Sequence, residues 1–146
     1  MEIRDGLGLS PRKVTYLKYI AECDGPVKTS DLATRSGVDP STITKTLSEL
    51  ADAGLLILAP YHGASLSPAG REYAAFLIKR HRILALALTH FGLSDEEACT
   101  EVSRFESLVS RDAIDRMCKA MGHPRQGVCG EITHDTGCLG YGRGPV

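Results

Sequence analysis

The order of hydrophobic and polar residues between positions 29 and 66 predicts two short helices followed by a β-hairpin. The first helix, residues 29–36, opens on hydroxyl residues able to cap free amide groups and ends at Gly37, which tolerates a positive φ. The second begins after Asp39, an N-cap residue followed by proline, and ends at Gly54. Its apolar positions recur at helical spacing and form a core face: Ile43, Leu47 and Leu50.

The opposite face of the second helix carries small polar side chains that would let it enter a DNA major groove and donate to phosphates and base edges. They are Ser41, Thr42, Thr44, Lys45 and Ser48. Two strand-like runs, residues 55–58 and 64–66, then flank a turn at Tyr61 and His62. Together these elements predict a winged helix-turn-helix that binds double-stranded DNA, with Thr29, Tyr61 and His62 as further contacts. A purely structural hairpin is the alternative for the wing.

The rest of the chain predicts a mainly α protein with a small β-wing. Ser-Pro steps open helices at residues 11 and 68, and the latter runs to about residue 91. A capping box at Ser94 and a cap at Ser110 start two more helices, ending near residues 109 and 121. We expect a DNA-binding domain over 1–68, a linker helix and helical dimerisation domain over 69–121, and a glycine-rich tail containing Cys and His over 122–146.

Residues 83–88 of the linker helix are apolar almost all round, which a small domain has difficulty burying unless a partner covers them. We therefore expect a homodimer.

Charge and composition argue against several classes of function. The formal net charge of −1 argues against a nonspecific polybasic binder, and few aromatic residues argue against stacking on single strands. With neither a signal peptide nor a membrane-spanning apolar run, we expect a cytoplasmic protein that does not bind membranes. No catalytic grouping stands out, so we expect no enzyme and no catalytic residues.

Several segments resemble the diphtheria-toxin-repressor and manganese-transport-regulator family of metal-dependent repressors. They are residues 29–33, 41–47, 66–71, 80–84 and 122–124. The resemblance covers nearly the whole chain to about residue 130. It implies a winged helix, a helical dimerisation domain, and a dimer that binds a palindromic operator when a divalent transition metal is bound. The SH3-like domain of longer members is expected to be absent.

The resemblance also implies metal ligands, several of which are changed here. The first-helix ligands fall on Thr15 and Lys18, which are poor ligands. The linker-helix histidine is present as His81, its glutamate partner is Ala85, and a further histidine position holds Cys99. The last ligand cluster reads Ser103, Glu106 and Ser107. The residues still able to coordinate are His81, Cys99 and Glu106.

In a reducing cytoplasm, the cysteines suggest thiols or metal ligands before disulfides. Four lie in the C-terminal half and match the number that a tetrahedral Zn²⁺ or an iron–sulfur cluster requires: Cys99, Cys118, Cys129 and Cys138. His123 and His134 could substitute for some of them. A metal anchor would supply the energy to order a patternless tail. The alternative places Cys99 and Cys118 in the core and leaves the tail loose.

These observations favour a homodimeric transcriptional repressor that responds to an iron–sulfur cluster or Fe²⁺, with Zn²⁺ or Mn²⁺ as alternatives. One rival is a ligand-independent or organic-ligand winged-helix regulator with core cysteines. Another is a redox or protein-interaction module built on a winged helix.

Overall fold

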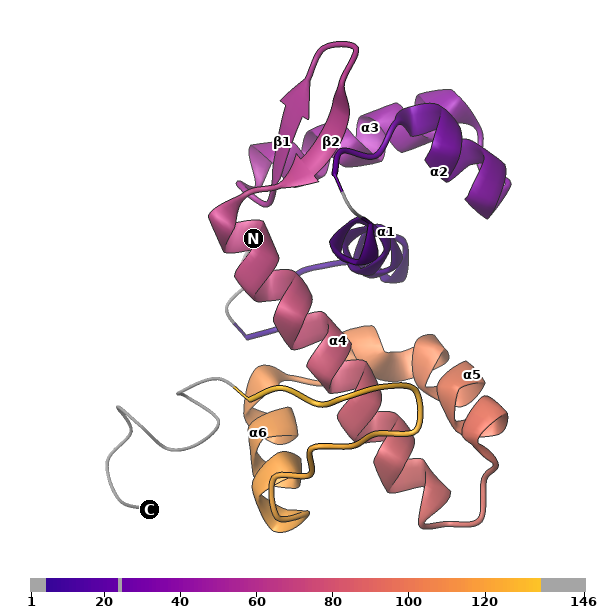
Figure 1. Cartoon of the computed structure of the whole chain (residues 1–146), viewed down its shortest axis with the longest axis vertical. Coiled ribbons are helices and arrows are strands. Elements are labelled where there is room, and N and C mark those ends of the chain that lie inside the picture. The colour runs from indigo at the N-terminus through magenta and orange to yellow at the C-terminus, as the bar shows by residue number, and fades with distance from the viewer. Residues whose placement is uncertain (1–4, 24, 135–146) are drawn as a thin grey trace. The chain divides into compact units, whose positions relative to one another are not determined.

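The computed structural model describes residues 5–23 and 25–134, and these form two compact units (Figure 1). The first unit is Arg12–Ala75, and the second combines residues 5–11 with residues 76–134. The boundary between the two units falls between Ala75 and Phe76, inside one long helix. The sequence analysis placed the domain boundary between residues 68 and 69.

The first unit is a winged helix-turn-helix, as predicted. Its elements are α1 (Pro11–Glu22), α2 (Thr29–Ser36), α3 (Pro40–Asp52), β1 (Leu56–Ala59), β2 (Gly63–Leu66) and the first two turns of α4 (Pro68–Thr89). The antiparallel hairpin pairs Leu56 with Leu66 and Ala59 with Gly63. Val27 adds a short bridge to β2, exchanging both backbone hydrogen bonds with Ala64 at 2.8 Å.

The start of α3 follows the predicted capping chemistry, but the start of α2 does not. The Asp39 carboxylate accepts a hydrogen bond from the Thr42 amide, and Pro40 occupies the first turn of α3. The N-cap of α2 is Lys28, which makes no side-chain cap. The expected hydroxyl cap at the start of α2 was wrong, because Thr29 and Ser30 lie within the helical first turn.

A single apolar core holds the first unit together. Helices α1, α2 and α3 each contribute residues that are almost fully buried: Val14, Leu17, Leu32, Ile43 and Leu50. Lys13 of α1 also forms an ion pair with Glu49 of α3 at 2.9 Å, and this interaction lowers the pKa of the Glu49 carboxyl. Helix α3 is thus held against α1 by both apolar packing and this ion pair.

The second unit consists of α helices and one short 3-10 turn. It holds the remainder of α4, α5 (Asp95–Phe105), the turn η1 (Glu106–Leu108) and α6 (Arg111–Ala120). The predicted capping box is present: Ser94 and Glu97 cap each other's backbone amides, and these bonds lower the pKa of Glu97. The helix predicted to reach residue 109 ends at Phe105. No described helix is long and apolar enough to cross a membrane.

Buried cations on α4 tie the second unit together. Arg80 is fully buried, and its Nη1 donates to the carbonyl oxygens of Gly6 at 2.7 Å and Val109 at 3.0 Å. Lys79 is also buried, with its Nζ 3.9 Å from an Asp115 carboxylate oxygen. These contacts join the N-terminal segment, α4 and α6 within one unit.

Residues 122–134 form a loop that runs alongside α6 and α4 (Figure 1). The Gly127 amide donates to the Gly130 carbonyl, and the Ile132 amide donates to the Arg125 carbonyl, both at 2.8 Å. Arg82 of α4 donates to the Glu131 carbonyl. This loop is the described part of the predicted tail, and residues 135–146 lie outside the described chain.

Gly70 allows the hairpin and the start of α4 to pack closely. A Cβ at this position would lie 1.9 Å from the backbone carbonyl oxygen of Leu55, so the backbone would have to move. In an ordinary helix, glycine to alanine is stabilising by about 0.5–1 kcal/mol. Here overpacking should outweigh that gain.

We expect Gly70→Ala to lower the free energy of unfolding by about 1–3 kcal/mol, as overpacked sites do. Urea denaturation followed by circular dichroism measures the change. Glu72→Ala, at an exposed site in the same turn region, is the control and should change stability little. A higher urea midpoint for Gly70→Ala would contradict the close packing at this glycine.

Candidate DNA-binding surface and metal sites

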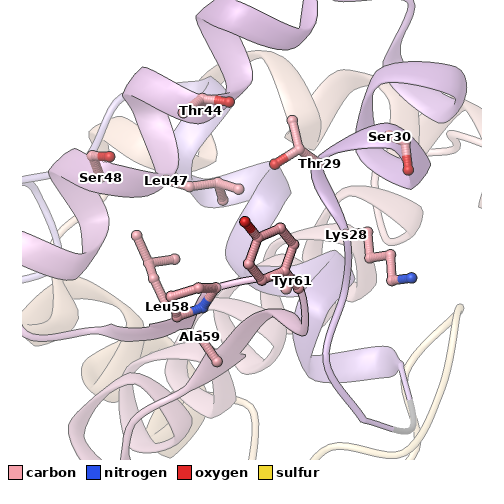
Figure 2. A pocket seen from close by; sticks show the side chains of 11 residues that line it. Lys28, Thr29, Ser30, Thr44, Leu47, Ser48, Leu58, Ala59 and Tyr61 are labelled. Carbon is pink, nitrogen blue, oxygen red and sulfur yellow. The ribbon is translucent and has the colours of Figure 1, made fainter.

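A hollow of about 470 Å³ opens on the first unit between the start of α2, α3 and the hairpin (Figure 2). It is lined from three elements by Lys28, Thr29, Ser30, Thr44, Leu47, Ser48, Leu58, Ala59, Pro60, Tyr61 and Gly63. Figure 2 shows the Tyr61 ring extending from the hairpin into this hollow, opposite Thr29 and the face of α3. The predicted recognition helix and the wing therefore border one shared surface.

The structure brings half of the predicted DNA-contacting residues to this hollow. Thr29, Thr44, Ser48 and Tyr61 line it. Of the others, Ser41, Lys45 and His62 are exposed and Thr42 is half-buried, and none of them lines the hollow. Ser41, Thr42 and Lys45 nevertheless belong to α3, the helix that also carries the lining residues Thr44 and Ser48.

Hydrogen bonding within α3 limits what its hydroxyl groups can offer to DNA. Ser41 donates its hydroxyl hydrogen to Asp39, and Thr44 donates to the Pro40 carbonyl at 2.9 Å. Both oxygens can still accept, for example from base amino groups. Lys45 is exposed and provides a cation on the same helix, which suits a phosphate oxygen.

Two polar residues that sequence reasoning missed also line the hollow. Lys28 and Ser30 flank Thr29 at the start of α2, where Lys28 is the N-cap. Helix N-termini favour anions, and a lysine there adds a full positive charge. A cation immediately before a predicted helix start is the signal that could have identified Lys28.

In the second unit, His81, Cys99 and Cys129 form a candidate metal site. They come from α4, α5 and the 122–134 loop, and their ligand atoms all lie within 4.8 Å of one another. His81 and Cys99 are half-buried and Cys129 is exposed. Residues separated by up to 48 positions in the sequence are thus assembled into one group with metal-ligand chemistry.

Glu106 contacts this group through His81. Its carboxylate oxygen Oε2 lies 2.5 Å from His81 Nδ1, and the glutamate is 3% exposed. A carboxylate on one ring nitrogen orients a histidine so that the other nitrogen can bind a metal. Imidazole and thiolate donors fit a transition metal such as Zn²⁺ or Fe²⁺.

A second group lies at the end of α6. Cys118 Sγ is 3.4 Å from His123 Nδ1 and 3.3 Å from His134 Nδ1. The ligand atoms of all three residues lie within 4.8 Å of one another. Cys118 is fully buried, and both histidines are half-buried.

The predicted cysteines are therefore divided between two groups. Among residues 5–134, Cys99 and Cys129 meet in one group and Cys118 in the other, each completed by histidine. Cys138 lies outside the described residues. Cys118 is fully buried, which also agrees with the alternative that this cysteine packs in the core. Among the described residues, this division offers mixed Cys and His sites and not one site of four cysteines.

Family models match two consecutive parts of the chain. The N-terminal DNA-binding domain of iron dependent repressors matches residues 8–64. Their metal binding and dimerisation domain matches residues 67–132, a range that contains His81, Cys99 and Cys129.

Curated relatives agree with these models. The transcriptional regulator MntR of Geobacillus kaustophilus is 32% identical over 111 residues, covering 74% of this chain and 79% of that protein. An HTH-type transcriptional regulator of Methanocaldococcus jannaschii is 29% identical over 100 residues, covering 68% of this chain and 80% of that protein.

Solved structures show the same fold. A protein from Sulfolobus solfataricus described as hypothetical superimposes with a TM-score of 0.74 at 26% identity, covering 86% of this chain and all of that one. A manganese-dependent transcriptional repressor in complex with manganese gives a TM-score of 0.68 at 30% identity, covering 79% of this chain and 55% of that one. The chain belongs to the iron-dependent-repressor family, whose members are metal-dependent DNA-binding transcriptional regulators.

Proposed function

We propose that this protein is a homodimeric repressor whose DNA binding responds to a transition metal held by His81, Cys99 and Cys129. The observation that carries the proposal is the meeting of these three ligands from α4, α5 and the 122–134 loop. The ion, when bound, supplies a cross-link among three separate segments. Such a cross-link would couple metal binding to the arrangement of α4, α5 and the 122–134 loop within the dimerisation domain.

Sulfur ligands set the metal preference of the proposed site. Thiolates select softer ions such as Zn²⁺, whereas Mn²⁺ prefers oxygen-rich sites. Two of the three ligands are cysteines. The glutamate expected from the family resemblance is replaced by Ala85, and Ser103 and Ser107 stand where the family places strong ligands. We infer that Zn²⁺ or Fe²⁺, and not Mn²⁺, is the effector of this site. An iron–sulfur cluster requires more thiolates than this group supplies.

Glu106 is a positioning residue for the proposed site. With His81 Nδ1 hydrogen-bonded to the Glu106 carboxylate, Nε2 is the nitrogen left to coordinate. The carboxylate belongs to η1, so it also fixes the α4 histidine relative to the turn that follows α5.

The DNA target follows from the helix-turn-helix and from dimerisation. Leu86, Ala87 and Leu88 of α4 are only half-buried in one chain, which leaves apolar surface for a second copy. Two copies would present two α3 helices to half-sites about one helical turn apart, or a multiple of it. A palindromic operator matches that two-fold symmetry.

Lys45→Ala should weaken binding to a duplex operator and reduce the salt slope by about one, because one phosphate contact is lost. Fluorescence anisotropy at several salt concentrations measures both quantities, using a duplex selected from a random library. Lys119→Ala, an exposed lysine of α6, serves as the control and should leave both unchanged. An unaltered salt slope for Lys45→Ala would place α3 away from the phosphates.

Cys129→Ser and Cys99→Ser should each weaken Zn²⁺ or Co²⁺ binding at the first site by at least about tenfold, because a thiolate ligand is removed. Competition with a chromophoric chelator measures these affinities. The matched control is Cys23→Ser, a half-buried cysteine of the first unit that belongs to neither group. Equal affinities for the wild type and both variants would exclude this site.

A further inference from the structure

We propose that Cys118, His123 and His134 form a second metal site, separate from the His81 group, that holds a Zn²⁺ ion and pins both ends of the 122–134 loop to α6. The site stands on its own geometry and does not depend on the proposed function. Its ligands are a buried cysteine from α6 and two histidines that begin and end the loop.

The distances fit tetrahedral coordination. Zn–S bonds are about 2.3 Å and Zn–N bonds about 2.0–2.1 Å, so a sulfur and a nitrogen on one tetrahedral ion lie about 3.6 Å apart. Cys118 Sγ lies 3.3 Å from His134 Nδ1 and 3.4 Å from His123 Nδ1. Small movements of these side chains would therefore accommodate the ion.

His134 is held in the tautomer that a metal needs. Its Nε2 lies 2.9 Å from the Pro124 carbonyl oxygen, which can only accept, so Nε2 carries the hydrogen. In the neutral ring, Nδ1 then presents a lone pair, and Nδ1 is the atom that faces Cys118 Sγ. A backbone carbonyl on the second nitrogen is the usual outer partner of a metal-binding histidine.

The backbone brings His123 to the same sulfur. The His123 amide donates to the Cys118 carbonyl at 2.8 Å, which closes the end of α6 and returns the chain toward the cysteine. The two imidazole rings lie with centroids 5.6 Å apart and planes nearly perpendicular, at 88°. Both rings thus direct an edge nitrogen at one buried thiol.

The site would order the loop that supplies Cys129. His123 and His134 lie at the base of the loop, and Cys129 lies between them in the sequence, in a segment whose most buried apolar residue is Ile132. Fixing both ends reduces the conformational freedom of the residues between them. A Zn²⁺ clip at the base would therefore hold Cys129 near His81 and Cys99.

Metal counting on the full chain tests this proposal. The protein is stripped with a chelator, reloaded with Zn²⁺, desalted and analysed for zinc per chain. We expect two equivalents for the wild type, one for His134→Ala and one for Cys99→Ser, because each variant disrupts a different group. His90→Ala, an exposed histidine outside both groups, should retain two equivalents. Circular dichroism establishes that each variant is folded.

A second readout uses Co²⁺ in the Cys23→Ser/Cys99→Ser/Cys129→Ser background. A sulfur-to-cobalt absorption band should persist there, and it should disappear when either Cys118→Ala or His134→Ala is added. A zinc content that is equal for His134→Ala and the wild type would overturn the second site. The second site would also be overturned if the wild-type protein bound one zinc ion per chain and only Cys99→Ser removed it. Cys118, His123 and His134 would then form a hydrogen-bond network without a metal.

The two proposals fail separately. If Cys99→Ser leaves zinc content and DNA affinity unchanged while His134→Ala loses one equivalent, the second site stands and the proposed sensing site does not.

Discussion

The second unit depends on the attachment of residues 122–134 to α4, α5 and α6. Ordering a backbone costs about 1–2 kcal/mol per residue, and burying one large aliphatic side chain returns only about 1.5–3 kcal/mol. Ile132 is the buried residue of this loop, with 2% of its surface exposed. The remaining attachment is polar, through Arg82 to the Glu131 carbonyl and through the two Cys and His groups. Under the two metal-site proposals, coordination would supply free energy that orders this loop.

Under the proposed function, this attachment would keep a metal site in the dimerisation domain although several family ligands are lost. Ala85 cannot replace the glutamate that the family resemblance places there, and Ser103 and Ser107 are weak substitutes for the strong ligands expected at their positions. Cys129 comes instead from the loop and joins His81 and Cys99. On this account, the change from oxygen to sulfur ligands keeps the position of the site within the dimerisation domain and alters which ion it selects.

Local signals in the sequence were sufficient for most of the fold. The Asp39–Pro40 start of α3, the capping box at Ser94 and the cap at Ser110 each act within four residues, so they can be recognised without tertiary information. The α2 start was mispredicted because Lys28 precedes two hydroxyl residues that mimic a cap.

The candidate sites depend on long-range packing that spacing does not encode. The sequence identified Cys99, Cys118, Cys129, His81, His123 and His134 as candidate ligands, because cysteine and histidine side chains are common metal ligands. Their division into two groups follows from how the loop returns along α6, which brings Cys118 to His134 and Cys129 to His81. Likewise, Lys28 lines the hollow of the first unit because the hairpin folds beside the start of α2.

The most direct test of the account is the affinity of the dimer for a selected duplex, measured by fluorescence anisotropy on metal-free protein and after adding Zn²⁺, Fe²⁺ or Mn²⁺. The account predicts at least about fivefold tighter binding with Zn²⁺ or Fe²⁺ than with Mn²⁺ or no metal, within the usual range of allosteric coupling. Cys129→Ser should abolish that gain. Equal affinity with and without every metal, or full activation by Mn²⁺ in Cys129→Ser, would contradict it.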